Sequence, residues 1–213
     1  MKDRHAFTLA LKNTLTRNVL IRTAILFGYQ IVGYYIVRLL TRGRVHLDMT
    51  LPPDRVIPVI PWTVLIYFSC FVFWAVNYVL ILRAEEGGDD RFFKADLIGK
   101  TAAFILFIFF PTTLTRPDIT GGGLMDALMR FLYRVDVPDG LFPSLHCYVS
   151  WMCAIGLRGK KQILRAYRAF SAVFAVCVFV STLTTKQHVL ADVASGFLIA
   201  EAAWFAAGRI HSK

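Results

Sequence analysis

Residues Val56–Leu82 read VIPVIPWTVLIYFSCFVFWAVNYVLIL and contain no charged side chain. A helix that crosses a membrane needs about 20 apolar residues, because it rises about 1.5 Å per residue through hydrocarbon about 30 Å thick. Pro58 and Pro61 stand near the start of the stretch, where the missing N–H of proline costs a helix little. The stretch therefore predicts a transmembrane helix and sets the fold class.

Five further apolar segments flank this stretch on both sides. Hydrophobic residues make up 56% of the 213 residues, and the 18% that are charged are concentrated between the segments. We therefore expect an all-α polytopic membrane protein, built as a bundle of six transmembrane helices. The other five predicted spans are Val19–Leu40, Leu97–Thr115, Phe142–Leu157, Ala169–Thr185 and Val189–Gly208.

The chain before the first span is basic and amphipathic. Residues 1–18 mix lysine and arginine with phenylalanine and leucine, a pattern typical of a helix lying on a membrane surface. A disordered basic tail fits the same pattern. Residues 19–213 are expected to form one membrane domain, with the functional motifs inside residues 97–208.

Lysine and arginine are distributed unequally between the two sides of the predicted bundle. They are twice as frequent on the side that holds both termini and the loops after the second and fourth spans. Because cytoplasmic loops are enriched in these residues, both termini are predicted to be cytoplasmic, in a cell or inner membrane. The loop Arg116–Leu141 then lies on the extracytoplasmic face.

That loop carries its own helical signal. Apolar residues recur at helical spacing over Leu124–Tyr133, which predicts a short helix, either on the bilayer surface or packed on the bundle. The preceding Gly121–Gly123 could offer backbone amides to an anion or act as a flexible hinge.

The formal net charge of +10 suggests a partner, and membrane lipid is the simplest one. Most cations flank apolar segments, which favours topology signals and contact with anionic head groups over nucleic-acid binding. The four cysteines form no Cys-x-x-Cys pair and fit as packing residues. The sequence gives no indication of oligomeric state.

Residues Ser181–Asp192, STLTTKQHVLAD, join the last two spans and contain ionisable groups. His188 and Asp192 are four residues apart, so on a helix their side chains are neighbours. Lys186 lies two residues earlier and could also snorkel toward the membrane surface. Ionisable groups at membrane depth are costly and therefore indicate a functional site.

Two more span ends on the predicted extracytoplasmic face carry polar residues. Arg116 follows the third span, and Ser144 and His146 open the fourth within Pro-Ser-Leu-His. Each residue also has a purely structural interpretation. Arg116 could be an interfacial anchor, Ser144 a helix cap and His146 an interhelical hydrogen-bond donor. Together with the last joint they place two histidines, a carboxylate and two cations on one face.

This set of side chains suits phosphoryl transfer without a metal. Cations and a helix amino terminus bind a tetrahedral oxyanion. A histidine oriented by a carboxylate is a nucleophile, and a second histidine can protonate a leaving alkoxide. A metal site is the competing interpretation, although the nearby cations disfavour it. We therefore expect no cofactor.

The motifs Arg116-Pro117, Pro143–His146 and Ser181…His188-x-x-x-Asp192 resemble the three signatures of the type 2 phosphatidic acid phosphatase superfamily. The family patterns are Lys-x6-Arg-Pro, Pro-Ser-Gly-His and Ser-Arg-x5-His-x3-Asp. The resemblance covers about Leu97–Gly208.

The resemblance implies an integral membrane phosphatase that hydrolyses a lipid phosphate or diphosphate. His188 would be the nucleophile that forms a phosphohistidine, Asp192 its orienting partner and His146 the general acid. Arg116 and the amides around Ser144 and Leu145 would hold the phosphate.

Three departures from the family pattern bear on the activity. Phe109 and Thr182 stand where the family has lysine and arginine, so Lys186 is expected to replace one cation. Leu145 stands in place of glycine, as in the inositol phosphorylceramide synthase-like branch. A lipid phosphotransferase, which passes a head group to an alcohol, and a non-catalytic protein that binds or transports a lipid anion are therefore the alternatives.

Overall fold

The computed structural model describes residues 16–84 and 89–211, which are mostly helical. Apart from a short 3-10 turn and a two-stranded parallel sheet, the described elements are α-helices. Their bounds are α2 (Arg17–Thr41), β1 (Leu47–Asp48), α3 (Pro52–Val56), η1 (Pro61–Thr63), α4 (Val64–Leu82), α5 (Asp90–Phe109), β2 (Thr112–Thr113), α6 (Leu124–Val135), α7 (Leu145–Gly156), α8 (Arg165–Thr184) and α9 (Leu190–His211).

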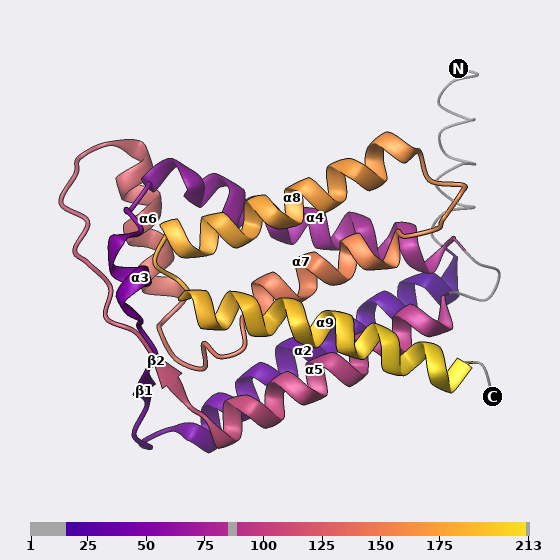
Figure 1. The fold of residues 1–213 in the computed structure, drawn as a ribbon, viewed down its shortest axis with the longest axis horizontal. Coiled ribbons are helices and arrows are strands. Elements are labelled where there is room, and N and C mark those ends of the chain that lie inside the picture. The colour runs from indigo at the N-terminus through magenta and orange to yellow at the C-terminus, as the bar shows by residue number, and fades with distance from the viewer. Residues whose placement is uncertain (1–15, 85–88, 212–213) are drawn as a thin grey trace.

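The long helices form one bundle, with the short elements collected at one end (Figure 1). Helix α7 packs against α4, α8 and α9, and α5 packs between α2 and α9. Helices α3 and α6 and the β1–β2 sheet lie together at the end remote from the carboxyl terminus of α9 (Figure 1). The short central α7 is therefore surrounded by longer helices.

Each of the six predicted spans contains a helix, and four of these helices are long and apolar enough to cross a membrane. These are α2, η1 with α4, α8 and α9. Helix α5 begins with several charged residues, and α7 has only 12 residues, about 18 Å of helix. Exposed leucine, isoleucine, valine and phenylalanine side chains cover the outer faces of the long helices, as expected of an integral membrane protein.

The second span begins later than predicted, and the prolines explain the difference. Ile57 and Ile60 each precede a proline and adopt extended backbone conformations, so α3 ends at Val56 and the long helix begins only after η1. The ring of proline disfavours helical geometry in the preceding residue. The same effect ends α5 at Phe109, because Phe110 precedes a proline, and the prediction of helix as far as Thr115 was wrong.

The predicted loop helix is present as α6, and it packs on the bundle. Met129 and Leu132 are buried against Val64 and Tyr67 of α4. In the glycine triplet, the N–H of Gly123 donates to the Asp126 carboxylate at 3.0 Å, so the chain's own side chain occupies that amide. The helix places its carboxyl end, at Val135 and Asp136, beside α4.

The proposed amino-terminal lead-in lies largely outside the described residues. Of residues 1–18, the structure describes only the last three, and α2 already begins at Arg17. The Thr16 side chain accepts a hydrogen bond from the N–H of Val19 and so caps the helix.

Candidate active site

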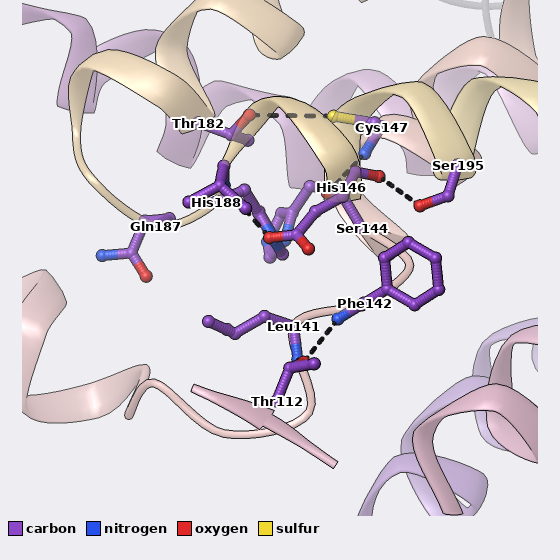
Figure 2. Close-up of polar contacts among 12 residues, drawn as sticks. Thr112, Leu141, Phe142, Ser144, His146, Cys147, Thr182, Gln187, His188 and Ser195 are labelled. Carbon is purple, nitrogen blue, oxygen red and sulfur yellow. Dashed lines mark hydrogen bonds and ion pairs between the residues drawn. The ribbon is translucent and has the colours of Figure 1, made fainter. Parts of the chain in front are cut away.

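The three polar joints predicted from the sequence meet at one end of the bundle. The N–H of Ser144, which caps α7, donates to the backbone carbonyl of Asp192 in α9 at 3.0 Å. Figure 2 shows Ser144, His146 and His188 gathered where these two helices begin. The start of the fourth span and the last joint therefore form one site.

His188 is held by a carboxylate and by its own backbone. Its Nδ1 lies 3.2 Å from Oδ2 of Asp192, and the N–H of Val189 donates to the same oxygen at 3.0 Å. The carbonyl of Thr182 accepts the N–H of His188 at 3.2 Å. Because Nδ1 faces the carboxylate, Nε2 is the ring nitrogen left for chemistry.

His146 lies beside His188 with a different support. The two imidazole centroids are 5.8 Å apart. Nδ1 of His146 lies 3.4 Å from the phenol oxygen of Tyr67, which donates its proton to the carboxylate of Asp136. Trp74 packs on the same ring, with centroids 5.4 Å apart. His146 also has Nε2 left for chemistry.

Ser144 and Leu145 form the start of α7. The Ser144 hydroxyl accepts the N–H of Cys147 at 3.2 Å, and its own N–H is bonded to Asp192. The hydroxyl of Ser144 thus caps α7, and its N–H joins α7 to α9. The amides of Leu145 and His146 occupy the first turn, where a helix leaves its N–H groups without intrahelical partners.

Arg116 reaches the site from the loop after β2. Its Nη1 donates to the backbone carbonyl of Asp136 at 2.5 Å, and its Nη2 donates to the side-chain oxygen of Gln187, also at 2.5 Å. The guanidinium lies 4.9 Å from the ring centroid of Tyr133. Burial raises the pKa of the Tyr133 phenol to about 12, so that ring stays neutral beside the cation.

Lys186 closes the turn between α8 and α9. Its φ of 54° lies in the left-handed region, which a residue other than glycine adopts at a cost of roughly 1–2 kcal/mol. Its ammonium donates to the backbone carbonyls of Asp54 at 3.0 Å and Ile57 at 2.6 Å. Lys186 therefore ties the segment around α3 to the loop that carries His188.

The two positions where the family pattern has a cation and this chain has none lie differently. Phe109 is 70% exposed at the end of α5. Thr182 is fully buried, and its hydroxyl lies 3.7 Å from the sulfur of Cys147 (Figure 2). A cation at position 182 would therefore have to displace the packing between α7 and α8.

Two pockets meet at His188. One, of about 440 Å³, is lined mainly by apolar and aromatic side chains of α2, α4 and α6, and it also reaches His146 and Gln187. The other, of about 370 Å³, is lined by three cations, Arg55, Arg116 and Lys186, and one carboxylate, Asp54, among other residues. The histidine thus stands between an apolar chamber and a basic one.

Several residues of the site are not among those predicted from the sequence. They are Asp54, Tyr67, Asp136 and Gln187. Asp54 accepts the N–H of Leu190 at 2.7 Å and so holds the start of α9. The neighbour of His188, Gln187, carried the one usable signal, an amide next to the proposed nucleophile.

The residues present offer no obvious metal cage. Within residues 16–84 and 89–211, no three histidine, cysteine or carboxylate side chains lie close enough together to hold one ion. His188 and Asp192 face each other, and a cation, Arg116, lies nearby.

In the comparisons with known proteins, a family model matches the chain. The PAP2 superfamily model matches residues 55–206, which is more than half of the chain and includes every joint described above. No curated protein and no solved structure matches the chain.

Proposed function

The chain belongs to the PAP2 superfamily, and from that premise we propose that it is a lipid phosphatase acting through a phosphohistidine, without a metal. The observation that carries the proposal is the position of His188. Its Nδ1 faces Asp192, and the ring stands where an apolar pocket meets a basic one. A lipid phosphate has the same two parts, an apolar tail and an anionic head.

In the first step, Nε2 of His188 attacks phosphorus and the bond from phosphorus to the lipid oxygen breaks. Asp192 stabilises the positive charge that develops on the phosphorylated ring, through the proton on Nδ1. Protonated His146 gives its proton to the departing lipid oxygen. The products are a free lipid alcohol and the phosphohistidine.

In the second step, water attacks the phosphorus and the nitrogen–phosphorus bond breaks. His146, now neutral, takes a proton from the water and returns to its starting form. Inorganic phosphate leaves, and His188 is restored. A phosphate or a diphosphate ester can follow this course, since both place a phosphorus beside an oxygen leaving group.

Arg116 and the amino terminus of α7 would bind the phosphate oxygens. The guanidinium keeps Nε buried without a partner among the described residues, and the Leu145 amide lies in the first helical turn. Ser144 would act by fixing that turn against Asp192. Lys186 lines the same basic pocket and would supply the cation that positions 109 and 182 lack.

We also propose how the chain crosses the membrane. The six helices α2, α4, α5, α7, α8 and α9 would all cross the membrane, with α5 and α7 packed against the four helices that are long and apolar enough to span it. Both termini would be cytoplasmic, with the site on the extracytoplasmic face of the membrane.

Transfer to an alcohol is the second candidate. The basic pocket beside His188 has room for an acceptor hydroxyl, which would replace water in the second step. Leu145 in Pro-Ser-Leu-His also resembles the inositol phosphorylceramide synthase-like branch. Incubation with a polyol such as inositol or glycerol distinguishes the candidates, because transfer gives a new phosphate ester and hydrolysis gives inorganic phosphate.

The test of the main proposal is phosphate release from phosphatidic acid by the purified protein in detergent micelles containing EDTA. We expect release to persist in EDTA, and His188→Ala to lower it by on the order of 10⁴-fold or more. Brief incubation with ³²P-labelled substrate should leave acid-labile label on the protein. Activity that needs a divalent ion, or that survives His188→Ala, contradicts the mechanism, and binding without turnover indicates the non-catalytic alternative.

A further inference from the structure

We infer that Tyr67 and Asp136 are positioning residues for His146, and that they fix the nitrogen from which the leaving lipid oxygen receives its proton. The inference rests on the proposed function, because it assigns the support of the general acid in that reaction. Neither residue belongs to a motif of the sequence analysis.

The two histidines of the site are supported at the same ring atom. Asp192 faces Nδ1 of His188 directly at 3.2 Å. At His146, the phenol of Tyr67 stands between the ring and a carboxylate, since its oxygen lies 3.4 Å from Nδ1 and donates its proton to Oδ2 of Asp136. In each histidine, therefore, Nδ1 faces its support and Nε2 is left for chemistry.

The direction of the hydrogen bonds fixes the proton on His146. Tyr67 has one proton, and Asp136 accepts it. The phenol oxygen then has only lone pairs to offer, so Nδ1 of His146 must be the donor. With Nδ1–H directed at Tyr67, the second proton of the imidazolium lies on Nε2, which is the position a general acid requires.

Packing makes this arrangement rigid. Tyr67 is buried, and its ring lies on the imidazole with centroids 4.5 Å apart. Asp136 follows the last turn of α6, and α6 is anchored on α4 by Met129 and Leu132. The long Nδ1 contact of 3.4 Å is of the kind that tightens when substrate binds.

Asp136 also connects the two halves of the site through its backbone. Its carbonyl accepts Nη1 of Arg116, while its carboxylate accepts the proton of Tyr67. An Asp136→Asn substitution changes the carboxylate and leaves that carbonyl in place. The variant therefore separates the support of His146 from the support of Arg116.

The experiment compares two phosphate monoesters with the same tail, dodecyl phosphate and a dodecyl-substituted nitrophenyl phosphate. The alkoxide of the first needs a proton in order to leave, whereas the nitrophenolate of the second leaves as a stable anion. We expect Tyr67→Phe to lower kcat/KM, which reports only the first step, for dodecyl phosphate by on the order of 10- to 100-fold, a part of the roughly 10²–10⁴-fold that general acid catalysis contributes. The aryl substrate should change by less than about threefold.

Matched variants complete the design. Asp136→Asn should act in the same direction with a smaller effect, and His146→Ala should give the largest selective loss. In the His146→Ala background, Tyr67→Phe should cause no further loss, because the two residues act as one unit. Tyr133→Phe is the control, since it removes a buried phenol oxygen near the site that has no partner among the described residues.

A merely structural role for Tyr67 predicts equal losses on both substrates. Any result that leaves the ratio of the two rates unchanged therefore overturns the inference. The proposed function is checked separately by the wild type and His188→Ala. If the wild type cleaves neither ester, or if His188→Ala retains activity, both the function and the inference fail. If only the substrate ratio fails to respond, the function stands and the inference does not.

Discussion

The bundle contains two groups of buried polar residues, and they differ in whether their hydrogen bonds are complete. The first, which we name the Asp96 cluster, consists of Asp96, Lys100, Tyr78 and Tyr148, all fully buried. The ammonium of Lys100 donates to Asp96 at 2.6 Å, to the carbonyl of Leu26 at 3.0 Å and to Tyr78 at 3.3 Å. Both phenols donate to Asp96.

The candidate active site is incomplete by the same measure. Within the described residues, Nε of Arg116, Nε2 of Gln187 and Oδ1 of Asp192 are buried and have no hydrogen-bond partner. An unsatisfied buried polar group costs about 1–3 kcal/mol. The Asp96 cluster therefore joins α2, α4, α5 and α7, whereas the site keeps two donors and one acceptor free, as a site for a polar ligand should.

The largest expected effect is a loss of stability when the Asp96 cluster is disrupted. Lys100→Met leaves the Asp96 carboxylate buried without its cation, and breaking such a pair costs about 3–5 kcal/mol in free energy of unfolding. Denaturant unfolding in detergent micelles measures this loss. Activity per folded molecule should stay near that of the wild type.

The double variant Asp96→Asn with Lys100→Met is the control, and it should recover most of the lost stability because no unpaired charge remains. If Lys100→Met is as stable as the wild type, or if it loses activity while remaining folded, then the Asp96 cluster is not the structural group described here.

A smaller effect is expected at Arg116, and it should appear in catalytic activity rather than in stability. Arg116→Ala removes a charge-assisted phosphate contact, worth about 1.5–3 kcal/mol, so kcat/KM should fall roughly 10- to 100-fold. Steady-state kinetics with phosphatidic acid measures the fall. Arg116→Lys should recover only part of it, because an ammonium cannot bond Asp136, Gln187 and a phosphate in the planar arrangement of the guanidinium.

Stability provides the comparison for Arg116. Arg116→Ala should lower the free energy of unfolding by less than Lys100→Met does, since the guanidinium does not use all of its donors within the protein. A stability loss as large as that of Lys100→Met, with kcat/KM unchanged, would place Arg116 among the structural residues.

The smallest effect is expected at Lys186, which combines both roles. Lys186→Ala removes two hydrogen bonds to backbone carbonyls and one cation of the basic pocket. We expect KM to rise several-fold and the free energy of unfolding to fall by about 1 kcal/mol. Lys186→Gly should be the more stable of the two variants, because glycine adopts the left-handed φ of 54° without strain. If Lys186→Ala changes neither KM nor stability, both roles are wrong.

Much of the fold was predictable because its signals are local. The apolar segments each contain a helix, the spacing of Leu124–Tyr133 predicted α6, and Ser144 caps α7 as its position suggested. The errors were local too. Four residues between α3 and η1 are not helical because two prolines follow Ile57 and Ile60, and the apolar composition concealed that break.

By itself, the sequence determined the class of the protein and which residues carry the chemistry that we propose for its site. Runs of apolar residues specify membrane helices, and the short spacing of His188 and Asp192 brings them together at the start of α9, with His188 two residues before the helix begins. These features depend on a few neighbouring residues, so they can be read without knowing how the helices pack.

Only the tertiary structure decided which partners support the other half of the site. Tyr67 reaches His146 and Asp136 from 79 and 69 residues away in the chain, and Asp54 reaches Leu190 from 136 residues away. No local pattern encodes such pairs, because the packing of α4, α6 and α7 selects them. The support of His146 therefore came into view only once those helices were placed side by side.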